Sequence, residues 1–123
     1  MEQTIMIVDD SISVRKMVAF TLENAGYAVV EAENGRDALE KINGAPIHMF
    51  IVDLNMPHVD GLELTRSVRA MDRFRFTPIV MLTTESMEAK KQEGRAAGAT
   101  GWITKPFKPD QLIGVVKKVM PVN

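Results

Sequence analysis

Three aspartates, one threonine and one lysine each follow a short apolar run of the chain. Asp9 and Asp10 come after the first run, Asp53 after the third, Thr83 after the fourth and Lys105 after the fifth. Carboxylates bind hard cations and can attack phosphorus. A hydroxyl can donate a hydrogen bond to an oxyanion, and an ammonium group binds phosphate oxygens. If the fold brings these residues together, they form a site for a phosphoryl group.

The elements that must position them alternate along the chain. Apolar runs rich in β-forming residues predict strands at 4–8, 27–31, 47–52, 78–82 and 101–104. Helical spacing of apolar residues predicts five helices, from Ser11 or Ser13 to about 24, from 34 to 44, from 61 to about 71, from 85 or 86 to about 97, and from 109 to 119. Gly26, Gly44 and Gly98 are the predicted helix stops. Met17, Val18, Thr21, Leu22 and Ala25 form the predicted inward face of the first helix.

This alternation predicts an α/β fold, a doubly wound (βα)5 sandwich with a parallel sheet and helices on both faces. Ligands of such sheets bind outside the carboxyl ends of the strands. The five residues named above all follow strands, so we expect them to gather at one edge of the sheet.

Crowded carboxylates at that edge would need a counter-charge. A like-charged pair about 4 Å apart costs on the order of 4 kcal/mol at an effective dielectric of about 20. Lys105 is the one basic residue expected nearby, and it cannot balance three negative charges. Mg²⁺ prefers oxygen ligands and keeps several of its waters, so it fits. The chain has no cysteine and two histidines, which disfavours zinc. In the alternative interpretation, Asp9 and Asp10 only cap the following helix.

Asp53 is the one member expected at the centre of the sheet, so it is the predicted nucleophile. Its catalysis would consist mostly of positioning and charge stabilisation, with Mg²⁺ and Lys105 facing the equatorial phosphoryl oxygens.

Composition excludes several other classes of protein. The chain has 123 residues with 15 basic and 16 acidic side chains, which gives a net charge of -1. This balance shows no excess of positive charge of the kind that binds nucleic acid or an anionic membrane. The absence of cysteine excludes disulfides and a cysteine nucleophile. No signal peptide and no apolar run of about 18 residues is present. We therefore expect one cytoplasmic domain spanning 1–123.

Four motifs carry a resemblance to a known family. They are Ile7-Val8-Asp9-Asp10-Ser11, Asp53-Leu54-Asn55-Met56-Pro57 with Asp60-Gly61, Leu82-Thr83-Thr84-Glu85, and Lys105-Pro106-Phe107. The chain resembles the receiver domain of response regulators over essentially its whole length, and it is most similar to stand-alone chemotaxis regulators of the CheY type. The resemblance implies the strand order 2-1-3-4-5 and a cis peptide bond between Lys105 and Pro106.

The resemblance also implies roles for the site residues. Asp53 would accept phosphate from a histidine kinase, which makes the chain a signalling phosphoacceptor rather than an enzyme with a separate substrate. Asp10 and Asp53 would bind Mg²⁺ directly, the Asn55 backbone carbonyl would be a third ligand, and Asp9 would act through water. Thr83 and Lys105 would bind the phosphoryl oxygens.

An output surface follows from the same resemblance. Movement of Thr83 toward the phosphoryl group would let Trp102 pack inward, which changes the surface formed by the fourth helix, the fifth strand and the fifth helix. Trp102, Thr104, Phe107, Lys108 and Val115 are the candidate contacts of that surface. Each aromatic residue has its own alternative interpretation. Trp102 is then a fixed residue at the edge of the core, or Phe107 is part of the core rather than an output contact.

The implied setting is a two-component system in chemotaxis or motility. The expected partners are a CheA-like histidine kinase, a phosphatase and a target such as a flagellar motor switch protein, with the chain a monomer. No output domain is expected, because the last helix ends near the end of the sequence. A phosphorelay intermediate or phosphate sink is the alternative role. A Mg²⁺-dependent aspartyl phosphohydrolase is disfavoured because Asn55 stands where such enzymes need an acid. An FMN-binding module and a degenerate scaffolding receiver are two further alternatives.

Overall fold

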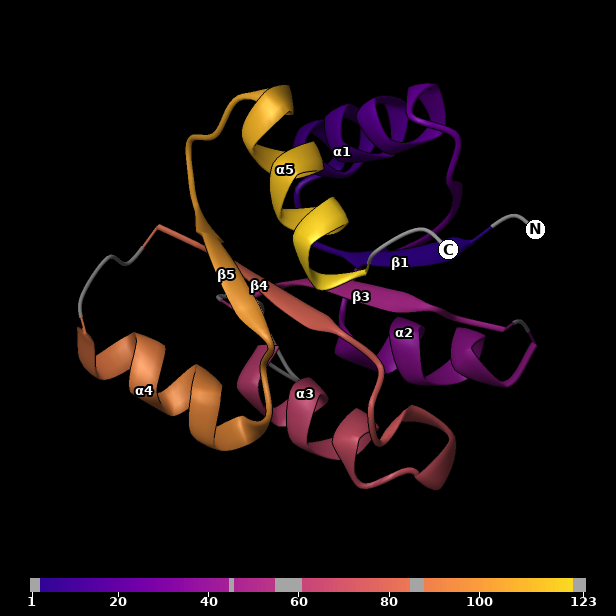
Figure 1. Cartoon of the computed structure of the whole chain (residues 1–123). Helices are drawn as coiled ribbons and strands as arrows, with labels where there is room; N and C mark the ends of the chain where they lie inside the picture. Colours follow the sequence, from indigo (N-terminus) through magenta and orange to yellow (C-terminus); the bar gives the residue numbers. More distant parts are fainter. Residues whose placement is uncertain (1–2, 45, 55–60, 85–87, 121–123) are drawn as a thin grey trace.

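A computed structural model describes residues 3–44, 46–54, 61–84 and 88–120. Within these residues, five strands alternate with five helices (Figure 1). The strands are β1 (Thr4–Val8), β2 (Ala28–Ala32), β3 (Met49–Asp53), β4 (Ile79–Thr83) and β5 (Gly101–Thr104). The helices are α1 (Ile12–Asn24), α2 (Gly35–Lys41), α3 (Gly61–Arg69), α4 (Glu88–Ala97) and α5 (Pro109–Val119), with short 3-10 helices at η1 (Ile42–Gly44) and η2 (Asp72–Phe74).

The strands form one parallel sheet in the order β2-β1-β3-β4-β5. Helices α1 and α5 cover one face of the sheet, and α2, α3 and α4 cover the other (Figure 1). The predicted doubly wound α/β fold and its strand order are confirmed. The order reverses between β1 and β3, which is where ligands bind in sheets of this kind.

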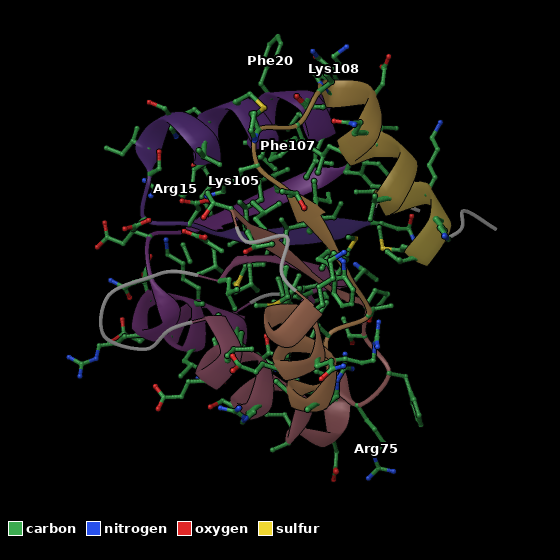
Figure 2. All side chains as sticks on the ribbon, turned by 90° about the vertical axis from the view of Figure 1, so that its left-hand side faces the viewer. Arg15, Phe20, Arg75, Lys105, Phe107 and Lys108 are labelled. Carbon is green, nitrogen blue, oxygen red and sulfur yellow. The ribbon has the colours of Figure 1, made fainter. Side chains whose placement is uncertain are left out.

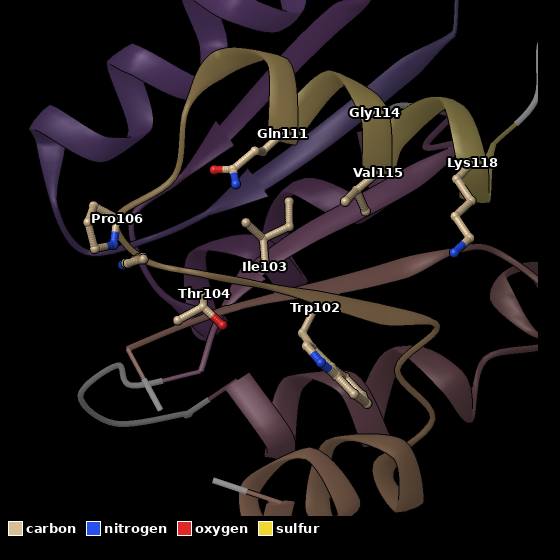
Figure 3. A pocket seen from close by; sticks show the side chains of 9 residues that line it. Trp102, Ile103, Thr104, Pro106, Gln111, Gly114, Val115 and Lys118 are labelled. Carbon is tan, nitrogen blue, oxygen red and sulfur yellow. The ribbon is translucent and has the colours of Figure 1, made fainter. Parts of the chain in front are cut away.

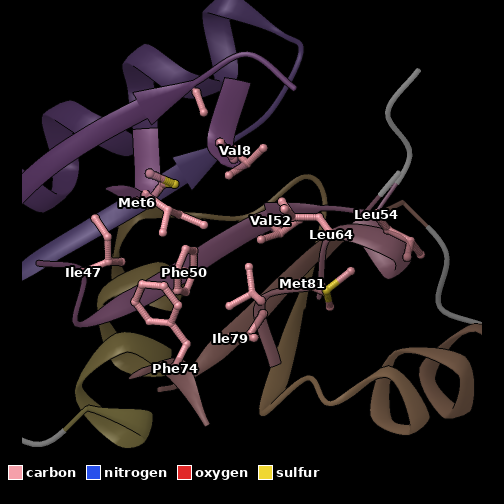
Figure 4. Close-up of a cluster of buried hydrophobic side chains, with 14 residues drawn as sticks. Met6, Val8, Ile47, Phe50, Val52, Leu54, Leu64, Phe74, Ile79 and Met81 are labelled. Atoms are coloured by element: carbon pink, nitrogen blue, oxygen red, sulfur yellow. The ribbon is translucent and has the colours of Figure 1, made fainter. Parts of the chain in front are cut away.

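The core consists of two apolar clusters, one on each face of the sheet. Alternate residues of β1 belong to opposite clusters, as the period-two geometry of a strand requires: Met6 and Val8 face α2 and α3, and Ile5 and Ile7 face α1 and α5. Strands β3 and β4 are buried along their whole length, which explains their unbroken apolar sequences. Figure 4 shows the cluster on the α2 and α3 side.

Local signals set several helix ends. The Ser11 hydroxyl caps α1 by accepting a hydrogen bond from the Val14 N–H at 3.3 Å, and Asn34 Oδ1 caps α2 by accepting from the Asp37 N–H at 2.8 Å. Gly26 adopts φ 99° after α1, and Gly98 adopts φ 111° after α4. Left-handed backbone of this kind favours glycine, so two of the three predicted stops, Gly26 and Gly98, are confirmed.

Some predicted boundaries and one predicted face differ from the structure. Strand β2 lies one residue later than predicted, helix α3 ends at Arg69, and the helix predicted for 34–44 divides into α2 and η1. Met17 and Ala25 were expected inward but are exposed, because the buried stripe of α1 is centred on Val18, Ala19 and Leu22. The predicted start of α4 at 85 or 86 lies outside the described residues. No helix in the described ranges is both long and apolar enough to cross a bilayer.

Candidate functional site

Strand register brings the predicted site residues to one edge of the sheet. Val8 pairs with Val52, so the residues that follow β1 lie beside Asp53 at the end of β3. Thr83, the last residue of β4, is buried, and its carbonyl accepts a hydrogen bond from the Lys105 N–H at 2.7 Å. The ends of four strands therefore meet, although their residues are far apart in sequence.

Three carboxylates form the centre of the site. One oxygen each from Asp9, Asp10 and Asp53 lies within 4.8 Å of the other two. Asp9 is 0% exposed and Asp53 is 5% exposed, whereas Asp10 faces solvent. Two buried negative charges repel each other more strongly than exposed ones, because less water screens them. The cluster therefore needs compensating positive charge.

Lys105 supplies part of that charge. Its Nζ donates a hydrogen bond to Asp9 Oδ2 at 3.0 Å and lies 3.5 Å from Asp53 Oδ1. One ammonium leaves two of the three negative charges uncompensated. An all-oxygen donor set with excess negative charge and one solvent-facing member fits Mg²⁺, which binds few protein oxygens and retains waters. Asn55, the predicted third ligand, lies outside the described residues.

Asp9 is held through its backbone as well as its side chain. Its Oδ1 accepts a hydrogen bond from the Ser11 N–H at 2.9 Å, and its own N–H donates to the Ala32 carbonyl at 3.2 Å. Its carbonyl accepts from Arg15 Nη1 at 2.7 Å. Contrary to the prediction, Lys105 is therefore not the one basic residue near the site, because Arg15 also contacts Asp9.

The spacing of Arg15 indicates where its side chain can reach, but not which group it binds. It lies five residues after Asp10, in the second turn of α1. Helical side chains lean toward the N-terminus of their helix, so a long side chain here can reach back to the preceding turn. The lean does not reveal which group the side chain will bind, and that group is the Asp9 carbonyl.

A small apolar hollow lies beside the site. It measures about 380 Å³ and is lined by Val14, Met17, Thr84 and Phe107 together with Lys105 and Pro106. The peptide bond between Lys105 and Pro106 is cis, as the resemblance implied. Phe107, a predicted output contact, is half-buried here against the core of the α1 and α5 face.

A second hollow follows β5 and α5 (Figure 3). This groove has a volume of about 730 Å³. Three predicted output residues line it, Trp102, Thr104 and Val115, together with the lysines Lys105 and Lys118. Trp102 is half-buried between the sheet and α4. Lys91 Nζ lies 5.6 Å and Arg95 Cζ lies 5.1 Å from the centroid of its ring, both within range of a cation–π contact.

Comparisons with known proteins agree with this arrangement. The response regulator receiver domain family model matches residues 5–117. Chemotaxis protein CheY1 of Helicobacter pylori is 40% identical over 121 residues, which is 97% of this chain and 98% of CheY1. A solved structure of Vibrio cholerae chemotaxis protein CheY4 has a TM-score of 0.95 and 48% identity, covering 98% of this chain and 100% of that one.

A longer relative shares the same domain. Transcriptional regulatory protein ResD of Bacillus subtilis is 38% identical over 119 residues, which is 97% of this chain and 48% of ResD. The chain therefore spans about half of ResD but nearly all of CheY1. With the family model matched along most of its length, the chain belongs to the response regulator receiver domain family of two-component systems, with CheY-type chemotaxis proteins among its relatives.

Proposed function

We propose that the chain is a phosphorylation-activated switch in which Asp53 accepts a phosphoryl group from a histidine kinase. The observation that carries this proposal is the position of Asp53. It is a buried carboxylate at the end of the central strand, next to a second buried carboxylate and 3.5 Å from an ammonium group. Receiver domains are phosphoacceptors, and its burial, its central position and the nearby ammonium group favour Asp53 as the acceptor.

In the proposed transfer, an Asp53 carboxylate oxygen attacks the phosphorus of a phosphohistidine. The new O–P bond forms while the N–P bond breaks, and the ring nitrogen keeps the electron pair and takes a proton from solvent. Lys105 binds a phosphoryl oxygen through its ammonium group, and the Thr83 hydroxyl donates a hydrogen bond to another. Water later cleaves the acyl phosphate and resets Asp53.

The carboxylates also account for a metal requirement. Asp10 and Asp53 would hold Mg²⁺ directly, and Asp9 would act through water, with the Asn55 carbonyl as the proposed third protein ligand. The bound ion would offset negative charge on the carboxylates and on the transferred phosphoryl group. Because Asp10 faces solvent, the remaining ligand positions can be filled by water.

The output would be a change in protein contacts at the surface formed by α4, β5 and α5. Movement of Thr83 toward the phosphoryl group changes the space open to Trp102, which lines the groove of this surface. The similarity to CheY1 and CheY4 supports a role in chemotaxis or motility. The proposed partners are a CheA-like kinase, a phosphatase and a target such as a flagellar motor switch protein, with residues 1–123 acting as a single monomeric cytoplasmic domain.

Beryllofluoride, an analogue of the acyl phosphate, tests the site and the switch together. With Mg²⁺ present, we expect saturable quenching of the single tryptophan, Trp102, in the wild type and no quenching in Asp53→Asn. Asp72→Asn is the matched control, because the Asp72 side chain is 95% exposed and pairs with Arg75. Quenching that survives in Asp53→Asn, or none in the wild type, would contradict the proposal.

A further inference from the structure

The turn between β1 and α1 carries two of the three clustered carboxylates, Asp9 and Asp10. The peptide that joins them is held by one side chain, because Arg15 Nη1 donates a hydrogen bond to the Asp9 carbonyl oxygen at 2.7 Å. Arg15 and Lys105 lie at the same end of the molecule, as Figure 2 shows, and both bind Asp9. Lys105 binds its carboxylate, whereas Arg15 binds its backbone.

The direction of the Asp10 side chain depends on this peptide. Among the described residues, no hydrogen bond reaches the Asp10 carboxylate, which faces solvent. The peptide group is planar, so a donor that holds the Asp9 carbonyl also fixes the orientation of the Asp10 N–H and the place of the Asp10 Cα. A change at the carbonyl would therefore redirect the carboxylate of Asp10.

Arg15 is itself held in place. Its side chain is 12% exposed, and its Nε lies 3.4 Å from Glu31 Oε1 on the neighbouring strand β2. That oxygen accepts no hydrogen bond within the described part of the chain, so the contact is one between charges. The guanidinium group uses separate nitrogens for Glu31 and for the Asp9 carbonyl, which its fixed fork of donors allows.

Glu31 also limits the charge that Arg15 brings to the site. A cation aimed at the carboxylates would compete with a metal ion, as Lys105 does. The positive charge of Arg15 is instead offset by Glu31, which also pairs with Lys16 at 3.1 Å. Arg15 thus affects the orientation of the carboxylates, and its positive charge competes little with a metal ion for them.

We propose that Arg15 is a positioning residue for the cation site: it holds the Asp9–Asp10 peptide so that the Asp10 carboxylate faces the same point as Asp53. This inference rests on the proposed Mg²⁺ site. It assigns a role to a residue that would contact neither the ion nor the phosphoryl group. Arg15 would act through the peptide bond that joins Asp9 and Asp10. Partners that orient metal ligands typically affect metal affinity by about 10-fold to 100-fold.

The test compares Mg²⁺ affinity in Arg15→Met and Lys16→Met by isothermal titration calorimetry. Each variant removes one positive charge and one partner of Glu31 from the same helix, but Arg15 alone of the two contacts Asp9. Loss of positive charge by itself would strengthen Mg²⁺ binding in both variants. We expect Arg15→Met to weaken binding about tenfold and Lys16→Met to leave it unchanged or slightly tighter.

Arg15→Lys gives a second test that does not depend on the first variant folding. A lysine keeps the charge but has a single donor group, so it cannot hold the Asp9 carbonyl and Glu31 from separate nitrogens. We expect its Mg²⁺ affinity to fall between those of the wild type and Arg15→Met. Urea unfolding without Mg²⁺ would confirm that the titrated variants are folded.

Three outcomes would overturn the inference. Binding as tight as in the wild type in both Arg15 variants would show that the turn is held without the arginine. Equal weakening in Lys16→Met would show that Glu31 pairing matters and that the contact with Asp9 does not. If the wild type itself binds no Mg²⁺, the proposed cation site fails too, which distinguishes that failure from the other two.

Discussion

Lys105 contacts Asp9 and Asp53, two of the three carboxylates of the proposed metal site, so the lysine should have opposite effects on the stability of the fold and on metal binding. Its ammonium group lies 3.0 Å from Asp9 Oδ2, and Asp9 is fully buried. Removing one partner of a buried charge pair leaves the other charge uncompensated. Lys105→Met should lower the free energy of unfolding without Mg²⁺ by about 1–3 kcal/mol. It should also tighten Mg²⁺ binding, because a competing positive charge is gone.

Urea unfolding in EDTA and calorimetric titration with Mg²⁺ measure these two effects. Lys108→Met is a suitable control, since Lys108 is an exposed lysine three residues away and its side chain has no ion pair among the described residues. A Lys105→Met variant that is both less stable and weaker in Mg²⁺ binding would contradict the view that Lys105 and the ion compete.

Gly61 lets the first turn of α3 pack directly on the end of β3. A Cβ atom at this position would overlap the Asp53 carbonyl oxygen and lie 2.8 Å from Leu54 Cα. Both neighbours are backbone atoms, so relief requires the helix or the strand end to move. We expect Gly61→Ala to destabilise the fold by about 1–3 kcal/mol and to weaken Mg²⁺ binding, because the displaced strand end carries Asp53.

The control for this substitution is Gly114→Ala in α5, where an added Cβ meets no atom within 4 Å. Alanine is a better helix former than glycine, so this variant should be slightly more stable than the wild type. Unfolding curves and Mg²⁺ titrations on both variants check the comparison. Equal behaviour of the two variants would show that the contact with Asp53 is unimportant.

At the scale of elements, helix α4 is linked to β5 by two cations on one aromatic ring. Lys91 and Arg95 are four residues apart, so they lie on the same side of α4, and both approach Trp102. Each such contact is worth roughly 0.5–1 kcal/mol at a partly exposed site. We expect Lys91→Ala and Arg95→Ala each to loosen Trp102, and the double variant to loosen it further.

Acrylamide quenching of Trp102 fluorescence measures this loosening directly, because the chain has a single tryptophan. The quenching constant should rise in each single variant and most in the double variant. Lys117→Ala on α5 removes one positive charge, as each single variant does, from a residue that does not contact the ring, and it should leave the constant unchanged. A constant that stays the same in the double variant would mean that packing against the sheet alone holds Trp102.

At the scale of the whole molecule, the sequence was sufficient for the sheet and for much of the site. Every strand has an apolar run of its own, and the carboxyl ends of parallel strands lie at a common edge, so the sequence predicts that Asp9, Asp53, Thr83 and Lys105 lie close together. The strand order, although predicted correctly, did not follow from the periodicity of the sequence. It came from the family resemblance.

Side-chain directions were the part that the sequence could not provide. Met17 has an apolar side chain at helical spacing, yet it is exposed, because the buried face of α1 is formed by Val18, Ala19 and Leu22. The contact of Arg15 with the Asp9 carbonyl and the contact of Arg95 with Trp102 both depend on how a helix is placed against the sheet. The close approach of Gly61 to Asp53 depends on the same tertiary packing.

The crowded carboxylates also predict how the stability of the whole fold responds to Mg²⁺. Folding brings one carboxylate oxygen each of Asp9, Asp10 and Asp53 within 4.8 Å of the others, and unfolding separates Asp53 from the other two. An ion that binds the folded chain alone adds about 2.7 kcal/mol at a concentration 100 times its Kd. We expect the wild-type melting temperature to rise with Mg²⁺ concentration, and Asp10→Asn to show a much smaller rise.

The same substitution should have the opposite effect when the metal is removed. In EDTA, Asp10→Asn removes one of three repelling charges while keeping the shape of the side chain, so the fold should become more stable than the wild type. Asp72→Asn, at an exposed position outside the cluster, separates this effect from the general effect of losing a negative charge. Calorimetric melting of the three proteins with Mg²⁺ and with EDTA completes the comparison. An Asp10→Asn variant less stable than the wild type in EDTA would show that the carboxylates do not oppose folding, and the need for a metal would then lose its physical basis.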